Sequence, residues 1–332
     1  MDKSFLLKKT FLYDNKMPIA KIINTTNQNI ITENDDYVYI TNEKYDNKID
    51  YSNNKINSFI KFLNNKNIHI STRDLEKVKD YLIYGNDRLI NNELKDLLIE
   101  YELNKDKDLY LNDYKFKFQP IPYINNETPR LFYFVAGASG SGKSFYIKNI
   151  LEQYNFYFKK SPIYLISEKK NDENYKHIKN MEIIDKEEIL DLNEKIAPYE
   201  YFISETGQSL VLFDDVEIYK KDKNISESFN KIVDSIATVG RSVGISAIYV
   251  NHGLINVSQS NISQLIFEST RIVIFPNHTI KSQIKYFLKK RLLFEDDLIN
   301  RILKINTRSC TIDVLNKCII SDYEIFFFWF II

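Results

Sequence analysis

The sequence contains few of the residues that form disulfides and metal clusters, and its apolar residues do not form runs of membrane-spanning length. Its 332 residues include only two cysteines, Cys310 and Cys318, and no Cys/His cluster at metal-ligand spacing. We therefore expect a reducing compartment and no disulfide framework. The N-terminal residues lack an apolar run long enough for a signal peptide, and the apolar run 325–332 is far shorter than a spanning helix. We interpret 325–332 as a buried final strand, with a membrane-touching tail as the alternative.

Neither sign of charge is in excess, because 45 Lys and Arg residues balance 45 Asp and Glu residues. This balance excludes a uniformly basic surface for nucleic acid, but it permits a local basic patch. One candidate DNA patch is a cluster whose first three members recur at helical spacing: Lys281, Lys285, Lys289, Lys290 and Arg291. A solvated helix face is the alternative interpretation of this cluster.

Proline is scarce, and several of the prolines gather at one point of the chain. Pro120 and Pro129 flank the polar run 125–128, where the periodic segments are interrupted. We therefore predict an N-terminal region of unknown role at 1–128 and a second unit at 129–332. An apolar share of 44 % is normal for a globular protein with a sizeable core.

The N-terminal region is expected to be a small α+β unit. Weak alternation at 37–40 indicates a small sheet, and Ser71–Asp74 resembles a helix start. Apolar residues at helical spacing predict helices near 56–63, 75–83 and 94–101. We find no chemical motif in this region.

After residue 130, apolar segments of strand length alternate with helical stretches. The predicted strands are 131–136, 162–167, 209–214, 245–250 and 271–275. This alternation predicts an α/β fold with a mostly parallel sheet that helices cover on both faces.

The first of these strands runs into a phosphate-binding motif. Residues 137–144 fit G-x-x-x-x-G-K-[ST], and a helical pattern follows them. Glycines let the backbone N–H groups point inward, and the helix start adds free N–H groups and a positive dipole end. Lys143 would reach the β- and γ-phosphates of ATP, and Ser144 would hold Mg²⁺. A glycine-serine turn that matches by chance is the alternative. The candidate nucleotide-binding residues are Gly137, Ser139, Gly140, Ser141, Gly142, Lys143 and Ser144.

A second strand, 209–214, ends in two carboxylates. Asp214 would emerge at the carboxyl edge of the sheet, where it would hold Mg²⁺ through water. Asp215 would orient or deprotonate the attacking water, although Glu217 is also near. An acidic loop after a core strand is the alternative for both residues.

The fourth strand carries further polar candidates at its two ends. Asn251 suits a γ-phosphate sensor, with an ordinary turn residue as the alternative, and His252 is interpreted as a loop residue. Arg241 is a candidate arginine finger, supplied by a neighbouring subunit, that would stabilise the charge on the transferred phosphoryl group. Arg271 and Arg308 are its rivals, and a helix C-terminal or DNA-facing arginine is the alternative interpretation of Arg241.

The residues after 130 resemble one known family. The resemblance rests on Phe213-Asp214-Asp215-Val216, on Gly240-Arg241, and on the segment from Ile245 to Asn251. These features are similar to the poxvirus-type DNA-packaging ATPases of large DNA viruses, in the FtsK/HerA group of P-loop motors. The resemblance covers about 130–308. It departs at Ser242, where the family often has His, and at Asn251, where it often has Gln.

The resemblance implies an ATP-driven motor that moves double-stranded viral DNA into a capsid. It implies ATP and Mg²⁺ as cofactors, and a homo-oligomeric ring, expected to be a hexamer, in which Arg241 crosses to a neighbouring site. Capsid or inner-membrane components of a virion are expected partners, without stable membrane insertion, in the virion or the host cytoplasm. The alternatives are a helicase or strand-export motor, and a nucleotide-binding scaffold without hydrolysis. The intact Asp214-Asp215 pair disfavours that scaffold.

Overall fold

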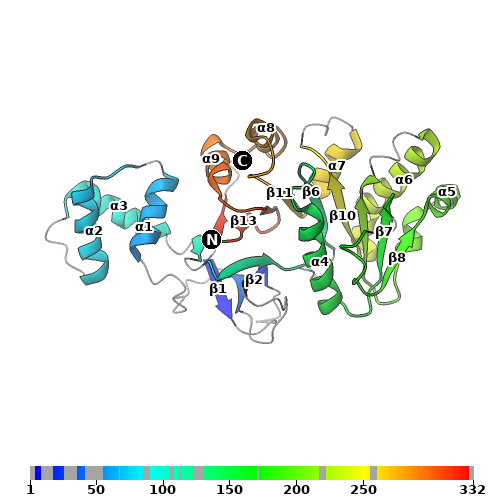
Figure 1. Cartoon of the computed structure of the whole chain (residues 1–332), viewed down its shortest axis with the longest axis horizontal. Coiled ribbons are helices and arrows are strands. Elements are labelled where there is room, and N and C mark those ends of the chain that lie inside the picture. The colour runs from blue at the N-terminus through cyan, green and yellow to red at the C-terminus, as the bar shows by residue number, and fades with distance from the viewer. Residues whose placement is uncertain are drawn as a thin grey trace.

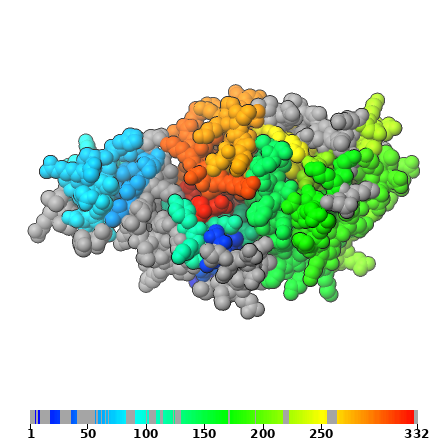
Figure 2. Space-filling view, viewed as in Figure 1, coloured from blue at the N-terminus to red at the C-terminus, as the bar shows by residue number. Residues whose placement is uncertain are grey.

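The computed structural model contains two β-sheets and the helices that pack on them (Figure 1). It describes residues 4–8, 18–25, 36–41, 55–66, 68–84, 90–104, 108–111, 114–122, 124, 130–169, 172–216, 222–254 and 260–328. In the space-filling view, a lobe formed by the N-terminal helices lies at one end of the molecule (Figure 2). The two sheets, with the helices on the faces of the larger one, make up most of the rest of the described chain.

The larger sheet has ten described strands in the order β4-β14-β13-β12-β11-β6-β10-β9-β7-β8. From β11 to β8 every pairing is parallel, whereas from β4 to β11 every pairing is antiparallel. The parallel strands are β6 (Phe132–Ala136), β7 (Ile163–Ser167), β8 (Met181–Ile184), β9 (Ser209–Asp214), β10 (Ile245–Asn251) and β11 (Arg271–Ile274). The antiparallel strands are β4 (Asp108–Tyr110), β12 (Cys310–Asp313), β13 (Cys318–Ser321) and β14 (Glu324–Phe327).

Helices cover both faces of this sheet, which confirms the predicted α/β fold. Alternate residues of β6 point to opposite faces, so Phe134 joins one buried cluster and Val135 joins the other. On the Val135 face lies α4 (Lys143–Tyr157). On the Phe134 face lie α5 (Lys186–Glu194), α6 (Lys223–Val239), α7 (Ser260–Glu268), α8 (Lys281–Arg291) and α9 (Asp296–Lys304). Short 3-10 helices at Pro198–Phe202 and Gly240–Val243 complete this half of the chain.

The N-terminal region is a small α+β unit, as predicted. Its antiparallel sheet has the order β1-β3-β2-β5, and its strands are Ser4–Lys8, Asp36–Thr41, Ala20–Asn24 and Phe116–Pro120 in that order. Its helices α1 (Lys55–Asn65), α2 (Thr72–Tyr84) and α3 (Asn92–Asn104) share a cluster of their own. The Ser71 hydroxyl accepts the Asp74 N–H at 3.1 Å, so Ser71 caps α2. The small sheet packs through Phe5 and Phe118 on β13 and β14.

The domain boundary at 128/129 stays a prediction. Strand β4 lies on its N-terminal side and pairs with β14 of the larger sheet. The predicted final strand at 325–332 begins in β14, and Phe328 after it is buried, while 329–332 lie outside the described residues. Cys310 and Cys318 are both free and buried. Among the described helices, none combines the length and apolar composition that a transmembrane span requires.

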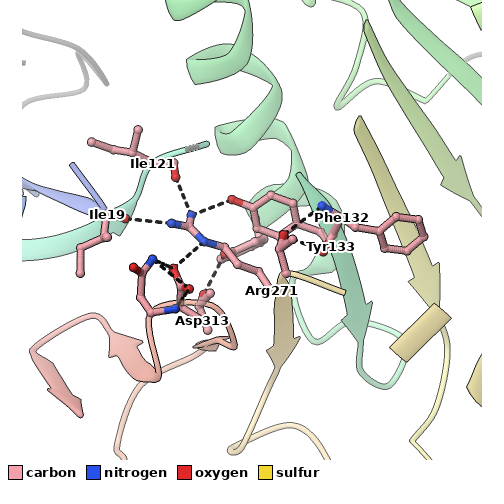
Figure 3. A network of polar contacts seen from close by, with 10 residues as sticks. Ile19, Ile121, Phe132, Tyr133, Arg271 and Asp313 are labelled. Atoms are coloured by element: carbon pink, nitrogen blue, oxygen red, sulfur yellow. Dashed lines mark hydrogen bonds and ion pairs between the residues drawn. The ribbon is translucent and has the colours of Figure 1, made fainter. Parts of the chain in front are cut away.

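Arg271 connects the two sheets from a fully enclosed position (Figure 3). Its side chain is 2 % exposed and its guanidinium donates to Asp313 Oδ2 at 3.1 Å and to the Tyr133 hydroxyl at 2.8 Å. It also donates to the backbone carbonyls of Ile19 and Ile121, which belong to the N-terminal region. Arg271 is therefore a structural residue of the interface between the two regions, and this position does not suit an arginine finger.

Candidate nucleotide-binding site

The glycine-rich loop lies where the sequence predicts, between the end of β6 and the start of α4. Gly140 and Gly142 have φ angles of 75° and 102°, a region that side-chain-bearing residues rarely adopt. A Cβ at Gly142 would lie 2.5 Å from Arg308 Nε. The backbone therefore turns sharply enough for the free N–H groups at the start of α4 to face the loop.

Polar groups inside this loop are arranged as an anion would require. Lys143 is 7 % exposed, and its ammonium donates to the carbonyls of Gly137 at 2.8 Å and Ala138 at 3.1 Å. Ser141 Oγ is buried, and within the described part of the chain it has no hydrogen-bond partner. A buried hydroxyl without a partner is costly, and a bound phosphate oxygen would satisfy it. The loop thus fits the phosphates of a nucleotide.

Asp214 and Ser144 both lie close to one tyrosine. Asp214 ends β9 and is 5 % exposed, and its Oδ2 accepts the hydroxyl of Tyr175 at 2.7 Å. Burial raises the pKa of Tyr175 most, the adjacent Asp214 raises it further, and the nearby Ser144 side chain lowers it. Burial raises the pKa of Asp214, and the neighbouring Asp215 carboxylate raises it further. A hydroxyl and a carboxylate at one point are the oxygen ligands that Mg²⁺ prefers, so the residues present fit this ion.

Asp215 is held by two side chains from neighbouring strand ends. Its backbone has a φ of 51°, which turns the carboxylate out of the line of β9. Asp215 Oδ1 lies 2.7 Å from His252 Nε2, and Oδ2 forms an ion pair with Lys169. Burial alone would raise the pKa of Asp215, but the bonds to Lys169 and His252 outweigh it and lower this pKa. Asp215 is therefore ionised and fixed in orientation.

Asn251 lies next to the glycine-rich loop at the end of β10. It pairs in register with Ala136, and its carbonyl accepts the N–H of Gly137 at 3.2 Å. Its side-chain amide donates to the carbonyl of Gly253 at 2.5 Å. Strands β6, β7, β9 and β10 are parallel, so the loop, Lys169, the two aspartates and Asn251 all follow the same edge of the sheet.

The arginine candidates occupy three different environments. Arg271 is buried in the interface described above. Arg308 is exposed, and its guanidinium donates to the carbonyls of Ser141 at 2.9 Å and Gly140 at 3.4 Å in its own chain. Arg241 is exposed in the 3-10 helix before β10, at the amino edge of the sheet. At about 3.3 Å per residue, β10 separates Arg241 from the site edge by roughly 20 Å.

The basic cluster of α8 is partly neutralised by one carboxylate. Lys289 Nζ lies 2.7 Å from Asp296 Oδ2, and Lys285 Nζ lies 3.6 Å from Asp296 Oδ1. Arg291 donates to Ser263 Oγ at 3.1 Å. These contacts favour the interpretation of the cluster as a solvated helix face.

Three residues at the site were not assigned a role from the sequence. Lys169 follows β7 by two residues, so the strand-end reasoning that selected Asp214 would also have selected it. His252 was interpreted as a loop residue, yet it contacts Asp215. Tyr175 comes from the connection between β7 and β8, where no periodic pattern marks it. Glu217, the rival of Asp215, lies outside the described residues.

Comparison with known proteins gives partial likenesses. No family model matches the chain. A Sputnik virophage protein named "Uncharacterized protein V3" is 27 % identical over 213 residues, which cover 64 % of this chain and 79 % of that protein. The genome packaging NTPase B204 of Sulfolobus turreted icosahedral virus 2, solved with ATP-gammaS, is 15 % identical with a TM-score of 0.37 and covers 60 % of this chain and 98 % of its own. The pCW3 conjugation coupling protein TcpA, solved with ATPgS, is 12 % identical with a TM-score of 0.39. The match covers 62 % of this chain and 63 % of TcpA. At these TM-scores, the structural likenesses decide neither function nor partners.

Proposed function

We propose that this protein is an ATPase that moves double-stranded viral DNA into a capsid. The observation that carries the nucleotide assignment is that the Tyr175 hydroxyl donates to Asp214 and lies near Ser144 of the loop motif. This proximity supports the assignment of the glycine-rich loop and the carboxylate pair to a single site. The assignment to DNA movement is supported by the sequence resemblance to packaging ATPases, and the viral setting is supported by the virophage relative.

In this proposal, the residues of 137–144 bind the triphosphate through backbone N–H groups and Lys143. Ser144 and Asp214 hold Mg²⁺, which neutralises charge on the phosphate oxygens when it is bound. Lys143 leaves the carbonyls of Gly137 and Ala138 for the phosphates, since an ammonium gains more from an anion than from neutral acceptors.

The residues next to the phosphates position the attacking water and contact the γ-phosphate. Asp215 accepts a hydrogen bond from the attacking water, and Lys169 and His252 keep its carboxylate oriented for this role. Asn251 contacts the γ-phosphate from the end of β10. Arg241 acts on the site of a neighbouring subunit in a ring, because it lies at the opposite edge of its own sheet.

The direct test measures phosphate release with and without linear double-stranded DNA. We expect ATPase activity that rises with DNA, and loss of turnover of at least about a hundredfold in Lys143→Ala. Lys148→Ala is the matched control, because Lys148 lies on the same helix and pairs only loosely, at 3.8 Å, with Glu152. ATPase activity that does not change when duplex DNA is added would contradict the packaging role and favour another motor. Tight ATP binding without turnover in any oligomeric state would favour the scaffold.

A further inference from the structure

Tyr175 occupies a rigid position beside the candidate metal ligands. It is 4 % exposed, and its ring packs in the buried cluster beneath α4. Its N–H donates to the Asp172 carbonyl at 3.0 Å, and its own carbonyl accepts the Ile178 N–H at 3.0 Å. The surrounding turn and the ring packing therefore direct the hydroxyl to one place, between α4 and the end of β9.

Like a metal-bound water, this hydroxyl donates a hydrogen bond to the candidate metal ligand. It donates to Asp214 Oδ2 at 2.7 Å, and the Ser144 side chain lies near enough to influence its pKa. In the proposed nucleotide complex, Ser144 and Asp214 would hold Mg²⁺.

We propose that Tyr175 controls metal entry: its hydroxyl takes the place of a magnesium-bound water between Ser144 and Asp214, and it withdraws when the metal–nucleotide complex binds. This inference rests on the proposed function, since it assigns a metal-dependent step to the same site. Metal must displace the hydrogen bond from Tyr175 to the buried Asp214 carboxylate before it can bind. The phosphates alone would bind to the loop N–H groups and leave this hydrogen bond in place.

The test uses Tyr175→Phe, which removes the hydroxyl and keeps the ring. Isothermal titration with ADP is run on the full chain, once with Mg²⁺ and once with EDTA. We expect the affinity for ADP with Mg²⁺ to rise at least about tenfold, because a hydrogen bond to an ionised group is lost only from the metal-free state. We expect the affinity for ADP in EDTA to stay within about twofold of the wild-type value.

Tyr146→Phe is the matched control. Tyr146 belongs to the same buried cluster, but its hydroxyl bonds with Thr311 at 2.8 Å. We expect the ratio of the two affinities to be unchanged in this variant. A Tyr175→Phe protein with the wild-type ratio would overturn the inference, and so would one with weaker binding of ADP in the presence of Mg²⁺, since Tyr175 would then support the bound metal. Wild-type protein that binds no ADP even with Mg²⁺ would overturn the proposed function and this inference with it.

Discussion

Replacement of Arg271 by leucine should destabilise the whole protein, because this residue joins its two sheets. The guanidinium is 2 % exposed, and its four described hydrogen bonds end on Asp313, Tyr133, Ile19 and Ile121. Leucine fills part of the volume but donates nothing. The Asp313 carboxylate, also 2 % exposed, would then be left without its cation.

The expected loss in the free energy of unfolding depends on the buried polar groups that Arg271→Leu leaves without a donor. Removal of one partner from a buried ion pair costs about 3–5 kcal/mol. Asp313 keeps the N–H and the side-chain amide of Asn316 as donors, which places the loss at the lower end of that range. The carbonyl of Ile121 loses its donor and adds about 1 kcal/mol, whereas the carbonyl of Ile19 still accepts the Ile121 N–H at 3.1 Å. We therefore expect a decrease of about 4 kcal/mol in the free energy of unfolding.

Urea unfolding followed by circular dichroism measures this change. The double variant Arg271→Leu/Asp313→Leu should be more stable than the single one, because it removes both buried charges. Arg73→Leu, at an exposed site on α2, should change stability by no more than about 0.5 kcal/mol. The reasoning is refuted if Arg271→Leu costs less than about 1 kcal/mol, or if the double variant is the less stable of the two.

Two further predictions concern the nucleotide site. Gly142→Ala should weaken ADP binding at least about tenfold more than Gly140→Ala in titration calorimetry. The φ of 102° at Gly142 lies well outside the left-handed region that alanine can adopt, whereas the φ of 75° at Gly140 lies close to that region. Equal losses would contradict this prediction. If Arg241 acts across a subunit interface, mixtures of Arg241→Ala and Lys143→Ala proteins should recover ATPase activity that neither has alone. Mixtures of Arg308→Ala and Lys143→Ala should not recover it, because Arg308 contacts the loop of its own chain; recovery in both mixtures would reverse the assignment.

The sequence predicted the parallel half of the sheet well, for a physical reason. Parallel strands that are buried on both faces consist of continuous apolar residues, so β6, β7, β9, β10 and β11 were identifiable. The antiparallel strands β12 to β14 have four residues each. The sequence pattern predicts only the last of them, as the start of the apolar run 325–332. Strands of this length have too little periodicity to be distinguished from turns.

Site residues at the ends of strands are predictable from the sequence. Site residues that reach their place through long-range packing are not. Asp214 was expected at the carboxyl edge because it ends an apolar run. The contact of Tyr175 with Asp214 spans 39 residues and starts from a turn. Arg271 is a comparable case, since nothing near it in the sequence indicates that it binds Ile19, 252 residues away. Such contacts are set by how elements pack, which a local pattern does not contain.

The pairing of β4 with β14 has a practical consequence for any attempt to produce residues 129–332 alone. A fragment that starts at residue 129 would lack β4. Strand β14 would then become an edge strand, and the backbone N–H and C=O groups that pair with β4 would be unpaired. The fragment would also lose Phe5 and Phe118, which shield the apolar side chains of β13 and β14 from water. Copies of such a fragment would aggregate through edge-to-edge pairing of β14. This aggregation should not be mistaken for ring assembly.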